Sequence, residues 1–185
     1  MLIPTPTTES LVSFEQAFRD HAPYVWRLLK RLGVHPDDVE DVCQEVFLVV
    51  HRKLHTYHGG STVRTWIYGI CTRVASEYKR RPYHRRETPT ADLPDEPADV
   101  SPEAKLDQKR ALLLLDRALD KLDHDKRAVF VLFEIEELSM ADVAAALQCP
   151  LQTAYARLYA ARKQVQSELK GRVDLPAPAN ERSAP

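Results

Sequence analysis

The segment from Thr56 to Arg81 carries aromatic and basic side chains at close spacing around a Gly-Gly loop. Aromatic rings can stack on unpaired bases, and arginine and lysine can follow the neighbouring phosphates. The aromatic residues are Tyr57, Trp66, Tyr68 and Tyr78, and the basic residues are Arg64, Arg73, Lys79, Arg80 and Arg81. The segment therefore suits the binding of single-stranded nucleic acid.

The same residues also fit an ordinary helix core. In a helix over residues 62–81, Trp66, Ile70, Val74 and Tyr78 recur every four residues and lie along one stripe. Aromatic residues at such spacing are usually buried, and a basic helix end complements the helix dipole. We expect Ile70, Val74 and Tyr78 to serve the core, and the preceding loop, Trp66 and the basic end to face nucleic acid.

The helix expected from Asp37 to Leu54 has an unusual polar face. Pro36 and two following acids mark its start. Its apolar positions predict one buried face: Val39, Val42, Cys43, Val46, Phe47, Val50 and Leu54. The opposite face carries Asp41, Gln44, Glu45, Leu48 and Arg52. A leucine framed by polar groups is typical of a protein-docking surface, although single exposed leucines are common.

Two adjacent helices near the C-terminus form a candidate helix-turn-helix. Ser139 and Asp142 have the spacing of a capping box, and Pro150 separates this short helix from a longer one over residues 151–170. The longer helix would bury Leu158, Ala161, Val165 and Leu169. Its other face would offer the following residues to a major groove: Thr153, Tyr155, Ala156, Arg157, Tyr159, Arg162 and Lys163. A helical hairpin within a bundle would have a similar pattern.

Charge is distributed unevenly along the 185 residues. The net charge is −1, but residues 1–86 carry +4, residues 87–104 carry −6 and residues 105–185 carry +1. The acidic segment also holds four prolines and little to bury, which predicts an extended flexible linker. We expect an all-α protein with a first domain over 12–86, a linker over 87–106 and a second domain over 107–172. The ends, 1–11 and 173–185, should be disordered.

Composition excludes several classes of protein. Cys43, Cys71 and Cys149 have no CxxC spacing, and no signal peptide or membrane span is apparent, so we expect a cytoplasmic protein with reduced thiols. No Gly-rich phosphate loop or Ser, His and Asp pattern supports catalysis, and we expect neither enzymatic activity nor a cofactor.

Two other functions were considered. A helix-turn-helix regulator that binds only duplex DNA would have no use for the single-strand segment or the acidic helix. A zinc site at His51, His55 and His58 lacks both the glutamate of the hydrolytic motif and a cysteine at ligand spacing. Exposed histidines explain that pattern better.

Three stretches in this order resemble bacterial RNA polymerase sigma factors of the extracytoplasmic-function group. DVEDVCQEVFLVVHRKL resembles the region 2.2 helix, TVRTWIYGICTRVASEYKRR resembles regions 2.3 and 2.4, and ELSMADVAAALQCPLQTAYARLYAARKQV resembles region 4.2. The resemblance covers about Phe14 to Gly171. It implies a factor that binds core polymerase, recognises promoter DNA and helps to separate its strands at a specialised set of genes, in response to stress or envelope signals.

The resemblance also implies a role for each candidate residue. The polymerase-binding residues would be Asp41, Gln44, Glu45, Leu48 and Arg52. The minus-ten element would be bound by Tyr57, His58, Ser61, Arg64, Trp66, Arg73, Lys79, Arg80 and Arg81. The minus-thirty-five element would be bound by Thr153, Tyr155, Ala156, Arg157, Tyr159 and Arg162. An anti-sigma factor that holds the protein between its two domains is a further family expectation.

Three residues depart from the family pattern. Arg73 stands where the family commonly has asparagine, and Tyr155 and Ala160 stand where the recognition helix commonly has basic residues. Losing two phosphate contacts would weaken duplex binding and lower its salt dependence by up to about two units of slope.

Overall fold

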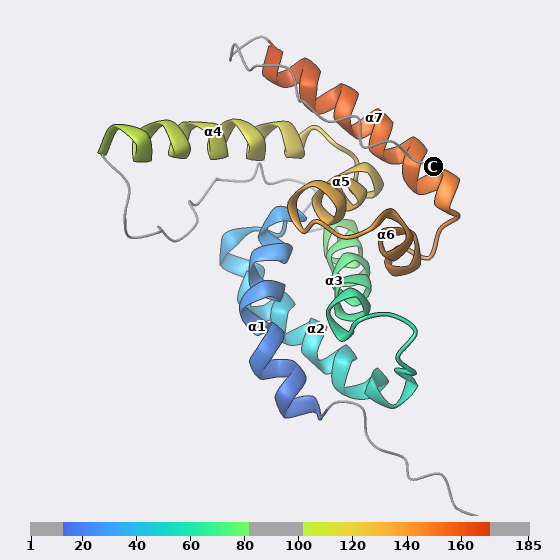
Figure 1. Cartoon of the computed structure of the whole chain (residues 1–185). Helices are drawn as coiled ribbons and strands as arrows, with labels where there is room; N and C mark the ends of the chain where they lie inside the picture. Colours follow the sequence, from blue (N-terminus) through green and yellow to red (C-terminus); the bar gives the residue numbers. More distant parts are fainter. Residues whose placement is uncertain (1–12, 82–101, 171–185) are drawn as a thin grey trace, which may run out of the picture.

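The computed structural model describes residues 13–81 and 102–170, with backbone alone over 102–110. The described residues form helices and turns without a strand, as expected of an all-α chain. The first half comprises α1 (Phe14–Arg31), η1 (Pro36–Asp38), α2 (Val39–Lys53), η2 (Leu54–Thr56) and α3 (Val63–Arg80). The second half comprises α4 (Pro102–Asp120), α5 (His124–Phe130), η4 (Val131–Ile135), α6 (Met140–Ala146) and α7 (Leu151–Lys170). Figure 1 shows α5 and α6 between the first half and α7.

Proline lacks a backbone donor, so the sequence predicts a helix break near Pro23; α1 is one continuous helix, and that prediction is wrong. Its first turn is capped by Ser13, whose side chain accepts a hydrogen bond from the Gln16 amide at 3.1 Å. Pro23 removes one backbone donor. Burial of Val25, Leu28 and Leu29 in the turns that follow stabilises the helix. The chain then turns at Gly33, whose φ of 86° favours glycine.

α2 and α3 complete the first half. α2 buries the expected apolar face, with Cys43 and Leu54 only half-buried. α3 begins at the N-cap Thr62, whose hydroxyl accepts a hydrogen bond from the Thr65 amide at 3.1 Å. Ile70, Val74 and Tyr78 are buried in α3 as the sequence predicted. These three helices pack against one another and give α3 a fixed orientation.

The second half contains the expected helix-turn-helix. Leucines at helical spacing over residues 110–122 predict a helix that starts at Arg110. α4 begins earlier, at Pro102, inside the segment expected to be linker; proline is favourable in a first helical turn. α5 continues into the π-helical segment η4. Ser139 caps α6 by accepting from the Asp142 amide at 3.1 Å, and a left-handed Gln148, with φ of 51°, helps the chain turn into α7.

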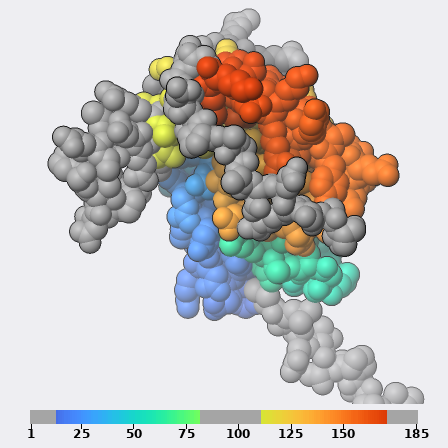
Figure 2. Space-filling view, turned by 45° about the horizontal axis from the view of Figure 1, so that its top comes forward, coloured from blue at the N-terminus to red at the C-terminus, as the bar shows by residue number. Residues whose placement is uncertain are grey.

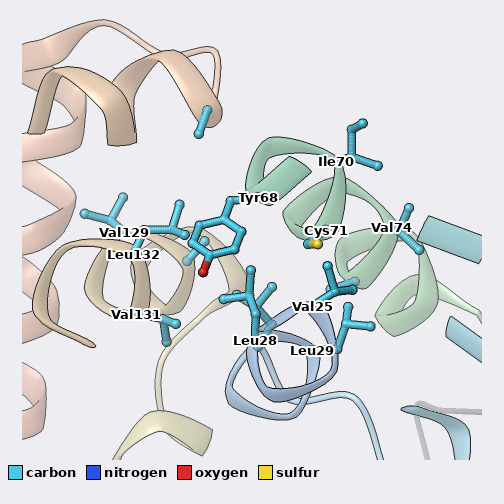
Figure 3. Packing of buried hydrophobic residues seen from close by; sticks show 14 of the residues in the cluster. Val25, Leu28, Leu29, Tyr68, Ile70, Cys71, Val74, Val129, Val131 and Leu132 are labelled. Atoms are coloured by element: carbon cyan, nitrogen blue, oxygen red, sulfur yellow. The ribbon is translucent and has the colours of Figure 1, made fainter. Parts of the chain in front are cut away.

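One hydrophobic core runs through both halves. The ring of Tyr68, from α3, lies between Leu28 of α1 and Leu132 of η4, with Val129 of α5 close by (Figure 3). Tyr68 is 0% exposed, so the idea that its ring could stack on bases is wrong. Its hydroxyl bonds to a residue of the second half, and α6 packs directly on α3. The two halves are therefore in direct contact.

The predicted linker and the predicted disordered ends fall mostly on residues that the structure does not describe. Residues 87–101 of the linker predicted over 87–106, and the predicted disordered ends over 1–11 and 173–185, lie outside the described residues. Within the described part, no helix has the length and apolar character needed to cross a bilayer. Cys43, Cys71 and Cys149 are all free thiols.

Tyr78→Phe tests a hydrogen bond that fixes α3 to the start of α2. The Tyr78 hydroxyl donates to the Asp38 carboxylate at 2.6 Å and accepts from the His35 amide at 3.3 Å. Because a hydrogen bond to a charged group contributes about 1.5–3 kcal/mol, we expect the free energy of unfolding in urea to fall by that amount. An unchanged midpoint would contradict this assignment.

Candidate nucleic-acid interface

The polar face of α2 presents an exposed leucine. Leu48 is 62% exposed, and Asp41 and Gln44 beside it are also exposed. Arg52 donates a hydrogen bond from Nε to the Leu48 carbonyl oxygen at 3.3 Å, so its guanidinium lies against this turn. Glu45 is half-buried and pairs with Arg81 at 2.7 Å. The five residues predicted to dock a protein thus share one face, and one of them reaches α3.

The loop before α3 is organised around two aromatic rings. The Tyr57 hydroxyl donates to the Ser61 carbonyl oxygen at 2.6 Å, which closes the loop into a tight turn. The ring centroids of Tyr57 and Trp66 lie 5.6 Å apart, and Trp66 is half-buried against the core. His58 is exposed at the loop tip, and Gly59 has a φ of 75°. Tyr57, His58, Ser61 and Trp66 therefore lie together in and beside one ordered loop.

The basic residues of α3 do not form a free basic strip. Arg64 donates to Glu136 of the second half at 3.0 Å and to the Tyr68 hydroxyl at 2.8 Å. Arg73 donates to the Gly69 carbonyl oxygen at 3.1 Å and to Gln148 of the second half at 3.3 Å. Arg64 and Arg73, both predicted to contact the minus-ten element, thus bond to the second half of the protein.

The last turn of α3 faces a cleft shared with the second half. Lys79 and Arg80 line this cleft of about 440 Å³ together with Lys126 of α5 and Arg157 of α7. Burial, together with the nearby Arg127 guanidinium, lowers the pKa of Lys79 to about 8. Arg80 is exposed there. The cleft is therefore basic on the α3 side.

α7 exposes two tyrosines where a recognition helix would meet DNA. Tyr155 is 53% exposed and Tyr159 is 74% exposed, and Ala156 between them is exposed as well. Thr153 is half-buried in the first turn. Large exposed aromatic rings on a stable helix are a costly surface unless something covers them. Tyr155, Ala156 and Tyr159 are thus exposed, as the sequence predicted for this face of the helix.

The two arginines of α7 are already engaged within the second half. Arg157 pairs with Asp125 at 2.5 Å, and Arg162 pairs with Glu134 at 2.5 Å. The Arg162 guanidinium also lies 5.6 Å from the centre of the Phe133 ring. Exposed pairs of this kind contribute little to stability. They can exchange for phosphate contacts at small cost.

Sequence reasoning missed the buried Glu136. Its side chain is 7% exposed and accepts from Arg31 at 2.6 Å, from Arg64 at 3.0 Å and from the Tyr68 hydroxyl at 2.8 Å. Burial, with the adjacent Glu136 carboxylate, raises the pKa of Tyr68. A signal was present in the EIEE run at residues 134–137, where acids interrupt an otherwise apolar helix.

Arg127 is a second buried charge that the sequence did not reveal. It donates from Nε to the Arg31 carbonyl oxygen at 2.6 Å and from Nη1 to Asp120 at 2.7 Å. Burial lowers its pKa, but an arginine remains charged. Arg127 thereby joins the end of α1 to α4.

The histidines considered as zinc ligands have other surroundings. His51 packs edge-on against the Phe14 ring, with centroids 5.0 Å apart, and His55 and His58 are exposed. Across residues 13–81 and 102–170, no group of three or more His, Cys, Asp or Glu side chains could hold a metal ion.

Two family profiles match this chain. Sigma-70 region 2 matches residues 17–86, and Sigma-70 region 4 matches residues 112–165. The ECF RNA polymerase sigma factor SigE of Mycolicibacterium smegmatis is 34% identical over 162 residues; the match covers 86% of this chain and 63% of that protein. The RNA polymerase sigma-H factor of Pseudomonas aeruginosa is 28% identical, over 77% of this chain and 79% of that protein.

Solved structures share the fold. CnrH, in complex with the cytosolic domain of CnrY, matches with a TM-score of 0.62 at 22% identity, over 86% of this chain and 89% of that one. The sigma factor RpoE of Bartonella quintana, in complex with the anti-sigma factor NepR, matches with a TM-score of 0.64 at 22% identity, over 86% and 98% of the two chains.

The lowered pKa of Lys79 can be measured directly. We expect its Nζ resonance, followed by NMR, to titrate near pH 8 in the folded chain. An unfolded lysine titrates near about 10.4, so between these values the folded state binds fewer protons and stability should rise with pH. A midpoint above pH 10 would show that Lys79 is not buried beside Arg127.

Proposed function

Because the chain belongs to the sigma-70 family of RNA polymerase sigma factors, in its extracytoplasmic-function group, we propose that it binds core RNA polymerase and directs it to specific promoters. The protein would act in the cytoplasm, separating promoter strands by binding them, with no covalent chemistry of its own. We further propose that it serves a specialised set of genes under a stress or envelope signal.

Polymerase docking is assigned to the exposed face of α2. The observation that carries this assignment is Leu48, an apolar side chain that is 62% exposed on a helix whose valines lie in or against the core. The surrounding Asp41, Gln44, Glu45 and Arg52 supply the polar rim that protein interfaces have around such a contact. The Glu45 pair with Arg81 would couple this surface to the basic end of α3.

Minus-ten recognition is assigned to the loop and the α3 surface. Tyr57 and Trp66 form an aromatic pair on which an extruded base could stack, and His58 and Ser61 lie in the same loop. The cations Arg64, Arg73, Lys79, Arg80 and Arg81 would follow the adjacent backbone. Arg64 and Arg73 would first have to leave Glu136 and Gln148.

Minus-thirty-five recognition is assigned to α7. Tyr155, Ala156, Arg157 and Tyr159 would meet base edges in the major groove, with Thr153 and Arg162 on phosphates. Tyr155 offers a ring in place of a cation, which supports apolar contact with thymine methyl groups rather than an added phosphate contact.

A protein inhibitor is a further proposed partner. CnrH and RpoE, which share this fold, were solved with the cytosolic domain of CnrY and with the anti-sigma factor NepR. We propose that an anti-sigma factor likewise binds this chain. An experiment that measures whether such a protein and core polymerase compete for this chain would test the proposed inhibitor.

Leu48→Asp tests polymerase docking. Loss of a central interface leucine costs about 2 kcal/mol or more, so we expect binding to immobilised core polymerase to weaken about thirtyfold. Leu48 contributes little to the core, so the melting temperature should be unchanged. Leu151→Asp, at an exposed leucine of α7, is the control and should bind as well as the unchanged chain. Undiminished binding by Leu48→Asp would refute the docking surface. Absence of binding by the unchanged chain would favour a regulator that acts without polymerase.

Trp66→Ala tests strand separation. Stacking contributes about 1–3 kcal/mol per base, so we expect open complexes, detected by permanganate reactivity of unpaired thymines, to fall about 5- to 150-fold.

Closed-complex binding by the same variant should change little. Trp26→Ala is the matched control, because Trp26 is an exposed tryptophan on α1 whose ring lies against Lys30 and is not assigned to DNA. Since Trp66 is half-buried, the open-complex ratio is measured at a temperature where both variants are folded. Equal losses in the two variants would contradict the role of Trp66.

A further inference from the structure

We propose that the cleft lined by α3, α5 and α7 is a binding site for a small ligand that carries two linked phosphates. The ligand is either a free diphosphate or a nucleoside diphosphate, which present the same charged group. The site does not depend on the proposed function, because it can be tested on the full chain in the absence of polymerase and DNA.

The cleft has the size of a small-molecule site. Its volume is about 440 Å³, and ligand pockets typically span about 300–1,000 Å³. A smaller cavity of about 130 Å³ adjoins it, since both are lined by Ser76, His124, Asp125 and Arg157. Figure 2 shows α7, in orange and red, packed against the rest of the molecule, which holds Arg157 at the cleft.

Positive charge predominates in this cleft. Its charged lining consists of four cations and two acids: Lys79, Arg80, Lys126, Arg157, Asp123 and Asp125. Four cations against two carboxylates leave a net charge of +2, whereas the whole chain carries −1. A concave surface with an excess of cations attracts anions, and arginine and lysine bind phosphate oxygens through charge-assisted hydrogen bonds.

The two acids do not neutralise the α3 side of the cleft. Asp123 pairs with Lys126 at 2.6 Å, and Asp125 pairs with Arg157 at 2.5 Å. The side chains of Lys79 and Arg80 form no ion pair or hydrogen bond with any residue that the structure describes. Two neighbouring cations of α3 are therefore available to a ligand.

Two groups in the cleft wall are disfavoured by this positive charge. Burial and the nearby Arg127 guanidinium lower the pKa of Lys79 to about 8, with Asp120 opposing the shift. Burial and the Lys79 ammonium lower the pKa of His124, whose Nδ1 is buried without a hydrogen-bond partner in the described part of the chain. Buried polar atoms are normally paired, and an anion in the cleft would favour the charged form of both side chains.

The placement of the cations favours a diphosphate over a single phosphate. Lys79 and Arg80 are adjacent in the last turn of α3, whereas Lys126 belongs to α5 and Arg157 to α7. A diphosphate has oxygens on two phosphorus centres and can meet cations from different helices at once. The pairs that hold Lys126 and Arg157 are partly exposed, so they can exchange for ligand oxygens at small cost.

Calorimetric titration of the full chain tests the site. The probes are inorganic pyrophosphate, orthophosphate and adenosine diphosphate at matched ionic strength. We expect one site that binds pyrophosphate about tenfold more tightly than orthophosphate, because the second phosphate adds a charge-assisted contact. Tighter binding of adenosine diphosphate than of pyrophosphate would support a nucleotide ligand, and equal binding would support a free diphosphate. Pyrophosphate binding no tighter than that of orthophosphate would overturn the proposal.

Two variants place the ligand in the cleft. Arg80→Gln removes an exposed cation and should weaken pyrophosphate binding about tenfold. Lys79→Gln should weaken binding without lowering the melting temperature, because it removes a cation that folding disfavours. The matched control is Arg19→Gln, an exposed arginine of α1 outside the cleft, which should bind as the unchanged chain does. Arg80→Gln decides the matter if Lys79→Gln fails to fold, and unchanged binding by Arg80→Gln would refute the site.

The titration of Lys79 gives a readout that is independent of affinity. Saturating pyrophosphate should raise the midpoint of the Lys79 Nζ resonance above its value of about 8, because a neighbouring anion favours the ammonium form. The groups that face Lys79 are Arg127 and Asp120, and both remain charged over this range. A midpoint that saturating pyrophosphate leaves unchanged would show that the anion binds elsewhere.

Discussion

The arrangement of the two halves depends on one buried carboxylate. The buried Glu136 carboxylate accepts hydrogen bonds from α1 and α3, and the Tyr68 ring and the close approach of Gly69 to Ala146 lie in the same interface. In a low-dielectric setting such a group is strongly favoured with its donors and strongly disfavoured without them. The interface should therefore behave as a two-state contact rather than a gradual one.

This constraint gives several residues two roles. Arg64 and Arg73 bond across the halves in the structure, yet both lie on the α3 surface that we assign to promoter DNA. Arg157 pairs with Asp125 and lines the shared cleft, although it lies on the helix assigned to the major groove. The docking leucine, Leu48, is by contrast exposed and makes no contact within the described residues that binding would have to break.

Local patterns predicted the elements well, because helix periodicity and capping act over a few residues. The start of α6 at Ser139 and the exposure of Leu48 both follow from spacing along one helix. Pro23 misled the prediction, because tertiary packing maintained a helix that its local preference opposed. The helical periodicity of α3 could not place Tyr68 against the second half, because it allows either an exposed or a buried ring at that position. Glu136 depends on residues that are more than sixty positions away, and no local pattern encodes such a contact.

The central claim is that this chain is a transcription initiation factor, and in vitro transcription tests it most directly. Purified core polymerase would be combined with the full chain and genomic DNA fragments, and the 5′ ends of the transcripts would be mapped. The account predicts a limited set of start sites that appear only when the chain is present and share sequence near minus ten and minus thirty-five. Transcription indistinguishable from that of core polymerase alone would contradict it.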